Sequence, residues 1–210
     1  MSANSVSGAE DGWAQLDRDR PLVIFGGTFD PPHIGHLIVA DDVYHRLRPA
    51  AVLFVPAATP PHKQDGSHTP AETRLHMVRL AVAADRRFLP CAVEVERGGV
   101  SYTIDTVAEL RAAGFKNLVV AVGADNLAEI PTWRDWEKLV AEVRFAVLTR
   151  PAHDLASAPA ALAGKFESWE VTPVPISSTM VRERVRAREP FRYLVPPPVF
   201  DFILSARLYR

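Results

Sequence analysis

Short apolar runs alternate with segments of helical periodicity along most of the chain. Runs that predict buried strands lie at 21–25 (PLVIF), 51–56, 89–96, 118–123 and 145–149, with a weaker one at 168–174 (SWEVTPV). The spacing also predicts helices over 34–47, 71–84, 104–113, 154–163, 178–188 and 198–207, and one helix with Thr132 as its N-cap. Strands that alternate with helices require βαβ crossovers, so we expect an α/β fold with a parallel sheet covered on both faces.

The organisation of the chain indicates one folded unit. It shows no internal repeat and no break in composition that would mark a second domain. Residues 1–20 are polar and mixed in charge and lack the apolar segment of a secretory signal, so we expect a disordered leader followed by one domain over 21–210. Ligands of open parallel sheets bind beyond the carboxyl ends of the strands. Residues that directly follow strands are therefore the candidates for a functional site.

Composition disfavours several classes of protein. The 210 residues carry a formal net charge of −1, which gives no global attraction to nucleic acid or to an anionic membrane. No apolar run approaches the roughly 18 residues of a membrane span. Cys91 is the single cysteine, which leaves no disulfide framework and no thiolate metal cluster. We expect a cytoplasmic protein that binds small molecules, with no nucleic-acid or membrane partner; the sequence leaves open whether it forms a homo-oligomer.

The stretch GGTFDPPHIGH (26–36) directly follows the first predicted strand. Its two leading glycines allow a tight turn or a close approach of the backbone to a ligand. His33 and His36 are three residues apart at the start of the next helix, where unpaired N–H groups and the helix dipole favour a phosphate. A strained turn with a capping histidine would explain one imidazole, but the pair favours a phosphate site. Asp30 is expected to orient this loop or to lie near a phosphate-bound metal.

A second unusual stretch, ISSTMVR (176–182), contains a predicted helix start. Its three hydroxyl side chains would be ordinary helix caps. Arg182, however, is expected in the first helical turn, where the helix dipole disfavours a cation. A bound triphosphate would resolve this conflict by accepting hydrogen bonds from the N–H groups, the hydroxyls and Arg182 together. The arginines at 184, 186 and 188 fit a solvated helix face.

The tetrapeptide H-I-G-H matches the nucleotide-binding signature of the nucleotidyltransferases and class I aminoacyl-tRNA synthetases, whereas the P-loop and dinucleotide-loop patterns are absent. The chain closely resembles the family of bacterial nicotinate-nucleotide adenylyltransferases over nearly everything from Pro21 onwards. The resemblance rests on GGTFDPPHIGH, PHK (61–63), RLHM (74–77), SYTIDT (101–106), GADN (123–126), the Trp133 segment, ISSTMVR and YLVPPPVFDFI (193–203). It implies a Rossmann-like, doubly wound sheet in three α/β/α layers, forming a single domain with C-terminal helices.

The resemblance also implies a reaction. The adenylyl group of ATP passes to nicotinate mononucleotide, which gives deamido-NAD and pyrophosphate in NAD biosynthesis. The mononucleotide phosphate attacks the α-phosphorus directly, so no covalent enzyme intermediate is expected, and catalysis consists of alignment and charge stabilisation. Mg²⁺ is the expected cofactor and is held on the ATP phosphates, with no metal ligand from the protein.

Functional residues follow from the matching motifs. The expected catalytic residues are His33, His36 and Arg182. The expected ATP contacts are Gly26, Gly27, Thr28, Phe29, His33, His36, Gly123, Asp125, Arg150, Ile176, Ser177, Ser178 and Arg182. The expected mononucleotide contacts are Asp30, Lys63, Tyr102, Thr103 and Trp133.

Three of these residues have ordinary explanations outside the family. Lys63 would then be a solvated loop lysine, and Asp125 would be a turn or cap residue instead of a ribose contact. One ring of the Trp133 and Trp136 pair would simply belong to the core; we assign Trp136 to the core and expect Trp133 to stack on the pyridine ring.

Alternative functions remain open at the level of the sequence. A homologue that prefers nicotinamide mononucleotide differs by one ring substituent, which the sequence does not separate, whereas Trp133 and SYTIDT (101–106) argue against a phosphopantetheine adenylyltransferase. A class I synthetase fragment would need a K-M-S-K-S-type loop and an anticodon-binding domain, which are missing. A nucleotide-binding protein without activity would tolerate loss of His36 or Arg182, and both are present. The chain departs from the family pattern in its leader and in PAHD (151–154), where an R-P-G turn is usual.

Overall fold

The computed structural model describes residues 12–60, 69–149 and 162–210. In this part of the chain, six parallel strands form one sheet in the order β3-β2-β1-β4-β5-β6. The strands are β1 (Leu22–Gly27), β2 (Ala51–Pro56), β3 (Phe88–Pro90), β4 (Leu118–Gly123), β5 (Arg144–Thr149) and β6 (Phe166–Glu170). This order is that of a doubly wound, Rossmann-like sheet, so the predicted α/β fold is confirmed.

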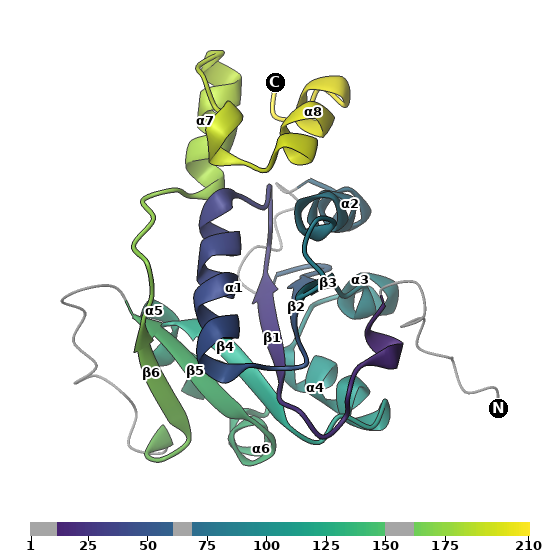
Figure 1. Ribbon diagram of the computed structural model, residues 1–210, viewed down its shortest axis with the longest axis vertical. Helices are drawn as coiled ribbons and strands as arrows, with labels where there is room; N and C mark the ends of the chain where they lie inside the picture. The colour runs from purple at the N-terminus through teal and green to yellow at the C-terminus, as the bar shows by residue number, and fades with distance from the viewer. Residues whose placement is uncertain (1–11, 61–68, 150–161) are drawn as a thin grey trace.

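Helices cover both faces of the sheet (Figure 1). One face packs against α1 (Ile34–Leu47) and α2 (Ala71–Val82), and the core on this side continues into α7 (Ser178–Ala187) and α8 (Pro197–Ser205). The other packs against α3 (Val93–Arg97), α4 (Thr103–Ala112) and α6 (Trp136–Glu142), while the single turn α5 (Ala124–Leu127) follows β4 directly. The fold therefore has three layers, and α7 and α8 lie beyond the carboxyl end of β1 (Figure 1).

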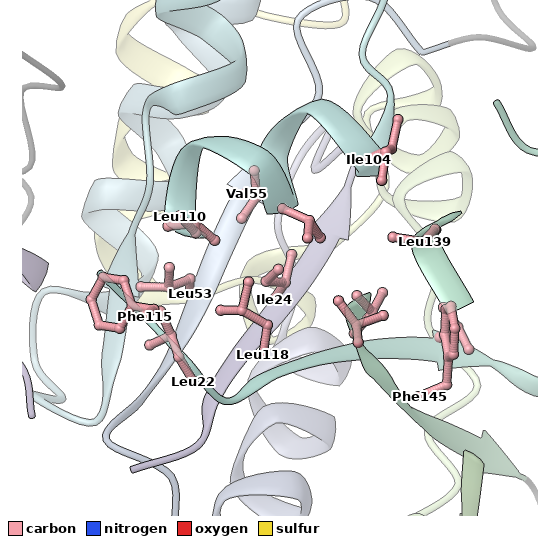
Figure 2. Packing of buried hydrophobic residues seen from close by; sticks show 14 of the residues in the cluster. Leu22, Ile24, Leu53, Val55, Ile104, Leu110, Phe115, Leu118, Leu139 and Phe145 are labelled. Carbon is pink, nitrogen blue, oxygen red and sulfur yellow. The ribbon is translucent and has the colours of Figure 1, made fainter. Parts of the chain in front are cut away.

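Alternation along each strand divides the core into two clusters, one on each face. In β1, Leu22 and Ile24 face α4, whereas Val23 between them faces α1 and α2. Figure 2 shows the first cluster, where Leu22, Ile24 and Leu118 from the sheet lie beneath Leu110 of α4. Because both faces are buried, the central strands read as continuous apolar runs in the sequence.

The chain reverses its winding between β1 and β4. From β1 it builds outward through β2 to β3, and from β4 it builds in the opposite direction through β5 to β6. Helices therefore cross to opposite faces at this point, and the loops after β1 and β4 diverge. The carboxyl ends of β1 and β4 form the crevice in which ligands of such sheets bind.

The strand predicted over 89–96 is wrong beyond its first residues. Pairing ends at Pro90, and Val93–Arg97 forms the short helix α3. The alternating valines suggested a strand, but Val93 packs into the cluster beneath β2 and Val95 packs against Leu75 of α2. Tertiary packing thus overrides the strand preference of β-branched residues.

Two other boundaries differ from the predictions. Thr132 does not cap α6, because its hydroxyl donates to the carbonyl of Glu129, 2.7 Å away; it ends a 3₁₀ turn, and Asp135 is the N-cap residue. The last strand spans Phe166–Glu170 and not 168–174, and the prolines at 173 and 175 that follow it lack a backbone donor for further pairing. The predicted helix over 154–163 lies almost wholly outside the described residues.

Part of the predicted leader is folded, which corrects the boundary at residue 20. Trp13 begins a 3₁₀ turn (Trp13–Gln15), and only 3% of its surface is exposed. The centre of its ring lies 6.0 Å from that of the Phe115 ring, and the guanidinium of Arg18 lies 3.9 Å from the centre of the Phe115 ring. Burial of one large aromatic explains why residues 12–20 are folded although their sequence is polar. No helix among the described residues is both long and apolar enough to span a membrane.

Candidate active site

The loop after β1 is built around a buried aromatic ring. Phe29 is 2% exposed and adopts a left-handed backbone with φ of 50°. A Cβ atom on Gly27 would lie 3.0 Å from this ring, so any larger residue there would press against it. The Asp30–Pro31 peptide that follows is cis. This loop carries the chain from the sheet to the amino end of α1.

His33 and His36 form a stacked pair at that amino end. Their ring centroids are 3.7 Å apart with an interplanar angle of 27°. The backbone N–H of His33, the N-cap residue, donates to Nδ1 of His36 at 3.0 Å. A Cβ atom on Gly35 would approach the His33 ring to 3.0 Å, which explains the glycine between the histidines. Because Nδ1 of His36 accepts a hydrogen bond, its neutral ring carries the proton on Nε2.

Both imidazoles are held neutral. Burial lowers the pKa of His33 to about 4. Burial, together with the neighbouring His33, lowers the pKa of His36 well below its ordinary value. Near neutral pH the pair therefore offers N–H donors without a fixed positive charge.

The amino end of α7 lies against the same loop. Ser177 is the N-cap residue, and its Oγ accepts from the backbone N–H of Met180 at 3.1 Å, so this hydroxyl is an ordinary cap. Ser178 Oγ donates to the carbonyl of Pro31 at 2.8 Å. α7 begins at Ser178, which places Arg182 in the second helical turn and not in the first, as had been expected.

Arg182 joins the two unusual stretches of the sequence. One of its Nη atoms donates to the backbone carbonyl of Asp30 at 2.8 Å, and the other donates to Oγ1 of Thr179 at 3.2 Å. The predicted conflict with the helix dipole is thus partly relieved by acceptors from the protein itself. The remaining guanidinium donors are available to an anion.

A cavity of about 430 Å³ lies between the amino ends of α1 and α7. We call it the histidine cavity, because His33 and His36 line it together with Ile176, Ser177, Ser178 and Arg182. Two helix amino ends, neutral imidazole donors, hydroxyls and a guanidinium thus converge on one space. This combination suits a polyphosphate.

A second cavity of about 480 Å³ lies beside it. We call it the tryptophan cavity, because Trp133 lines it together with Gly26, Gly27, Tyr102, Thr103 and Arg134. Four residues line both cavities, namely Phe25, Thr28, His36 and Gly123. Their positions at the ends of β1 and β4 and at the start of α1 put the junction at the switch point of the sheet. His36 is the ring at which the two spaces meet.

Aromatic and charged groups surround the tryptophan cavity. Trp133 and Trp136 both pack, partly buried, against the core beneath α4 and α6, but only Trp133 lines the cavity. The guanidinium of Arg134 lies 4.7 Å from the centre of the Tyr102 ring and 3.7 Å from a carboxylate oxygen of Asp105. Burial raises the pKa of Glu94, although the Thr106 hydroxyl donates to its carboxylate at 2.6 Å.

Most of the predicted site residues meet at these two cavities. Phe29 lines the histidine cavity. Asp30 also lines that cavity and does not line the tryptophan cavity, although it had been assigned to the mononucleotide. Asp125 lies exposed in α5 and lines neither cavity. Lys63 and Arg150 lie outside the described residues, so their roles stay predictions.

Sequence reasoning missed residues that hold or line the site. Arg74, which lies in the quoted RLHM motif, is 1% exposed and donates to the carbonyls of Thr28, Ala58 and Thr69 at 2.8 Å each. It ties the loop after β1 to the loop after β2. Arg134 lies between Trp133 and Trp136, and nothing in the local sequence around Arg134 or Tyr209 indicates a place at the site.

The comparisons with known proteins agree with this geometry. Residues 24–184 match the family model described as cytidylyltransferase-like. The chain is 44% identical over 197 residues to a probable nicotinate-nucleotide adenylyltransferase of Symbiobacterium thermophilum, covering 90% of this chain and 94% of that protein. A protein of the same description from Bacillus cereus is 37% identical over 191 residues, covering 90% and 98% of the two chains. The chain belongs to the nicotinate-nucleotide adenylyltransferase family.

Two solved structures of one Plasmodium falciparum enzyme have the same fold. The Plasmodium falciparum nicotinic acid mononucleotide adenylyltransferase complexed with NaAD has a TM-score of 0.73, with 20% identity, 90% of this chain and 97% of that chain covered. A second structure of that enzyme, complexed with APC, has a TM-score of 0.67, with 19% identity, 90% of this chain and 97% of that chain covered. At this identity the likeness supports the fold alone.

Proposed function

We propose that the protein transfers the adenylyl group of ATP to nicotinate mononucleotide, releasing pyrophosphate and deamido-NAD. The observation that supports this most directly is that two cavities, one rich in phosphate-binding groups and one lined by aromatic rings, meet at His36. A reaction that joins two nucleotides needs two such spaces whose reactive ends touch. Membership of the family identifies the pair of substrates.

ATP is assigned to the histidine cavity. The imidazoles of His33 and His36, both neutral, donate to the phosphates, and Nε2–H of His36 is the donor left free by its bond to the His33 backbone. Arg182 and the amino ends of α1 and α7 balance the negative charge of the β- and γ-phosphates. Preorganised donors of this kind act most strongly on charge that develops in the transition state.

The mononucleotide is assigned to the tryptophan cavity. Trp133 stacks on the pyridine ring, and Tyr102 and Thr103 line the same space. Gly26 and Gly27, which the sequence assigned to ATP, line this cavity together with His36, and the absence of side chains there leaves room for the 5′-phosphate. The phosphate is already an anion, so it attacks the α-phosphorus without a protein nucleophile, and the enzyme supplies alignment.

Mg²⁺ enters with ATP in this proposal. The described residues form no cluster of three or more histidine, cysteine or acidic side chains that could hold a metal ion. The carboxylate of Asp30 is engaged by Thr69 and Tyr209. Mg²⁺ on a nucleotide is usually held by phosphate oxygens and water, and we expect the same here. The ion neutralises charge on the phosphates.

The test offers the purified protein ATP and Mg²⁺ with either nicotinate or nicotinamide mononucleotide. We expect pyrophosphate and deamido-NAD with the acid, at a higher kcat/KM than pyrophosphate and NAD with the amide. Product only from the amide would reassign the acceptor. No product from either would refute the proposed reaction.

A further inference from the structure

Asp30 lies at the centre of a buried network that the reaction itself does not explain. Its side chain is 2% exposed. Oδ1 accepts from the Tyr209 hydroxyl at 2.7 Å, and Oδ2 accepts from the backbone N–H of Thr69 at 3.3 Å. The backbone carbonyl of Asp30 accepts from Arg182. One residue of the loop after β1 is thus held by groups from three distant parts of the chain.

Tyr209 reaches this position through an unusual backbone. Residues 206–210 follow α8, and both Arg207 and Tyr209 have left-handed φ values, 53° and 62°. A left-handed conformation is costly for a bulky side chain and persists only where surrounding contacts impose it. The ring packs partly buried against the cluster under α2 and α8, with its hydroxyl 3.9 Å from Sδ of Met77. The packing and the bond to Asp30 together hold this turn.

Two cations among the described residues, Arg74 and Arg182, act electrostatically on the Asp30 carboxylate. Three N–H groups of Arg74 already donate to backbone carbonyls, one each to Thr28, Ala58 and Thr69. Arg182, by contrast, keeps free donors and lines the histidine cavity. If the tyrosine hydroxyl were removed, the carboxylate would accept a hydrogen bond from Arg182 instead, because a buried charge requires hydrogen bonds.

We propose that Tyr209 is a positioning residue for the histidine cavity: by donating to Asp30, it fixes the loop before His33 and leaves Arg182 free to bind phosphate. This role rests on the proposed function. It places a residue 179 positions away from Asp30 in control of the ATP side of the site. The tryptophan cavity contains neither Asp30 nor Arg182, so its substrate is insulated from the change.

The test compares Tyr209→Phe with Tyr193→Phe in steady-state kinetics. Tyr209→Phe removes the hydroxyl and keeps the ring, whereas Tyr193 is 87% exposed and serves as the matched control. We expect kcat to fall about tenfold and the KM for ATP to rise several-fold in Tyr209→Phe, with the KM for the mononucleotide within twofold of wild type. Tyr193→Phe should leave all three constants unchanged. Assays are run well below the unfolding midpoint of each variant.

A double-mutant cycle with Asp30→Asn decides whether Tyr209 acts through Asp30. In the Asp30→Asn background, Tyr209→Phe should cause no further loss of kcat. Independent effects that multiply, or a Tyr209→Phe enzyme with kcat and both KM values within twofold of wild type, would overturn the proposal. Equal increases in both KM values would do the same. If Tyr209→Phe does not fold, Thr69→Val removes another side-chain donor to Asp30 and should give the same ATP-specific loss; normal kinetics there would refute the role. A wild-type protein without product would instead refute the reaction.

Discussion

The rings of His33 and His36 stack 3.7 Å apart, and the backbone N–H of the first donates to Nδ1 of the second. The same hydrogen bond caps α1 and sets the tautomer of His36. The bond that caps α1 also leaves the proton of His36 on Nε2, where it can serve a phosphate. One pair of residues thus begins the helix and prepares a donor.

Loss of the His36 ring should abolish most of the activity while the fold survives. We expect His36→Ala to lower kcat by roughly two to three orders of magnitude, the usual effect of removing one preorganised donor. Circular dichroism should be unchanged. His45→Ala, on the exposed side of the same helix, is the control and should retain normal turnover. Near-normal turnover of His36→Ala would exclude the phosphate contact.

The lowered pKa values predict how stability depends on pH. A histidine with a depressed pKa stays neutral in the folded state while it takes up a proton in the unfolded state. Its contribution to the free energy of unfolding is therefore complete above about pH 6.5 and declines as the pH falls toward about 4, the pKa of His33. Each such histidine adds a slope of up to about 1.4 kcal/mol per pH unit.

Urea unfolding between pH 7.5 and 5 measures this slope. His33→Asn places a favourable N-cap residue at the start of α1 but does not titrate, so its free energy of unfolding should fall less steeply on acidification than that of wild type. Identical slopes for the two proteins would show that His33 is not held neutral in the folded state.

Trp133 should matter for one substrate only. We expect Trp133→Ala to raise the KM for nicotinate mononucleotide roughly tenfold, because aromatic stacking on a base contributes about 1–3 kcal/mol. The KM for ATP should change little, since Trp133 does not line the histidine cavity. Trp133→Phe, which keeps a stacking surface, is the matched variant. An unchanged mononucleotide KM in Trp133→Ala would argue against stacking.

Arg134 is the only lysine or arginine among the described residues that line the tryptophan cavity, where Glu94 and Glu129 also lie. A guanidinium there favours the carboxylate of nicotinate over the neutral amide. We expect Arg134→Gln to reduce the ratio of kcat/KM for acid over amide about five- to tenfold, in keeping with about 1 kcal/mol for an exposed charge pair. Arg134→Lys should retain most of the preference. A ratio unchanged in Arg134→Gln would place acid recognition elsewhere.

Much of the fold and part of the site were predictable from local pattern. The buried runs of β1, β2, β4 and β5 and the periodicity of α1 were clear, because a two-sided core demands continuous apolar strands and amphipathic helices. The loop predicted to bind phosphate was equally clear, because glycines at a strand-to-helix junction allow close approach of the backbone and histidines there supply N–H donors. Val93–Arg97 was misjudged because the same residues suit a strand or a one-turn helix until α2 packs on them.

The alternation of strands and helices, the two stretches predicted to bind phosphate and the family resemblance follow from the amino-acid sequence. Three contacts do not: the burial of Trp13 in the core, the bonds by which Arg74 ties two loops together, and the contact of Tyr209 with Asp30. These contacts join residues far apart in the chain, and whether they form depends on how the helices pack on the sheet. Local periodicity records which face of an element is buried, but it does not record which distant side chain completes a buried hydrogen bond.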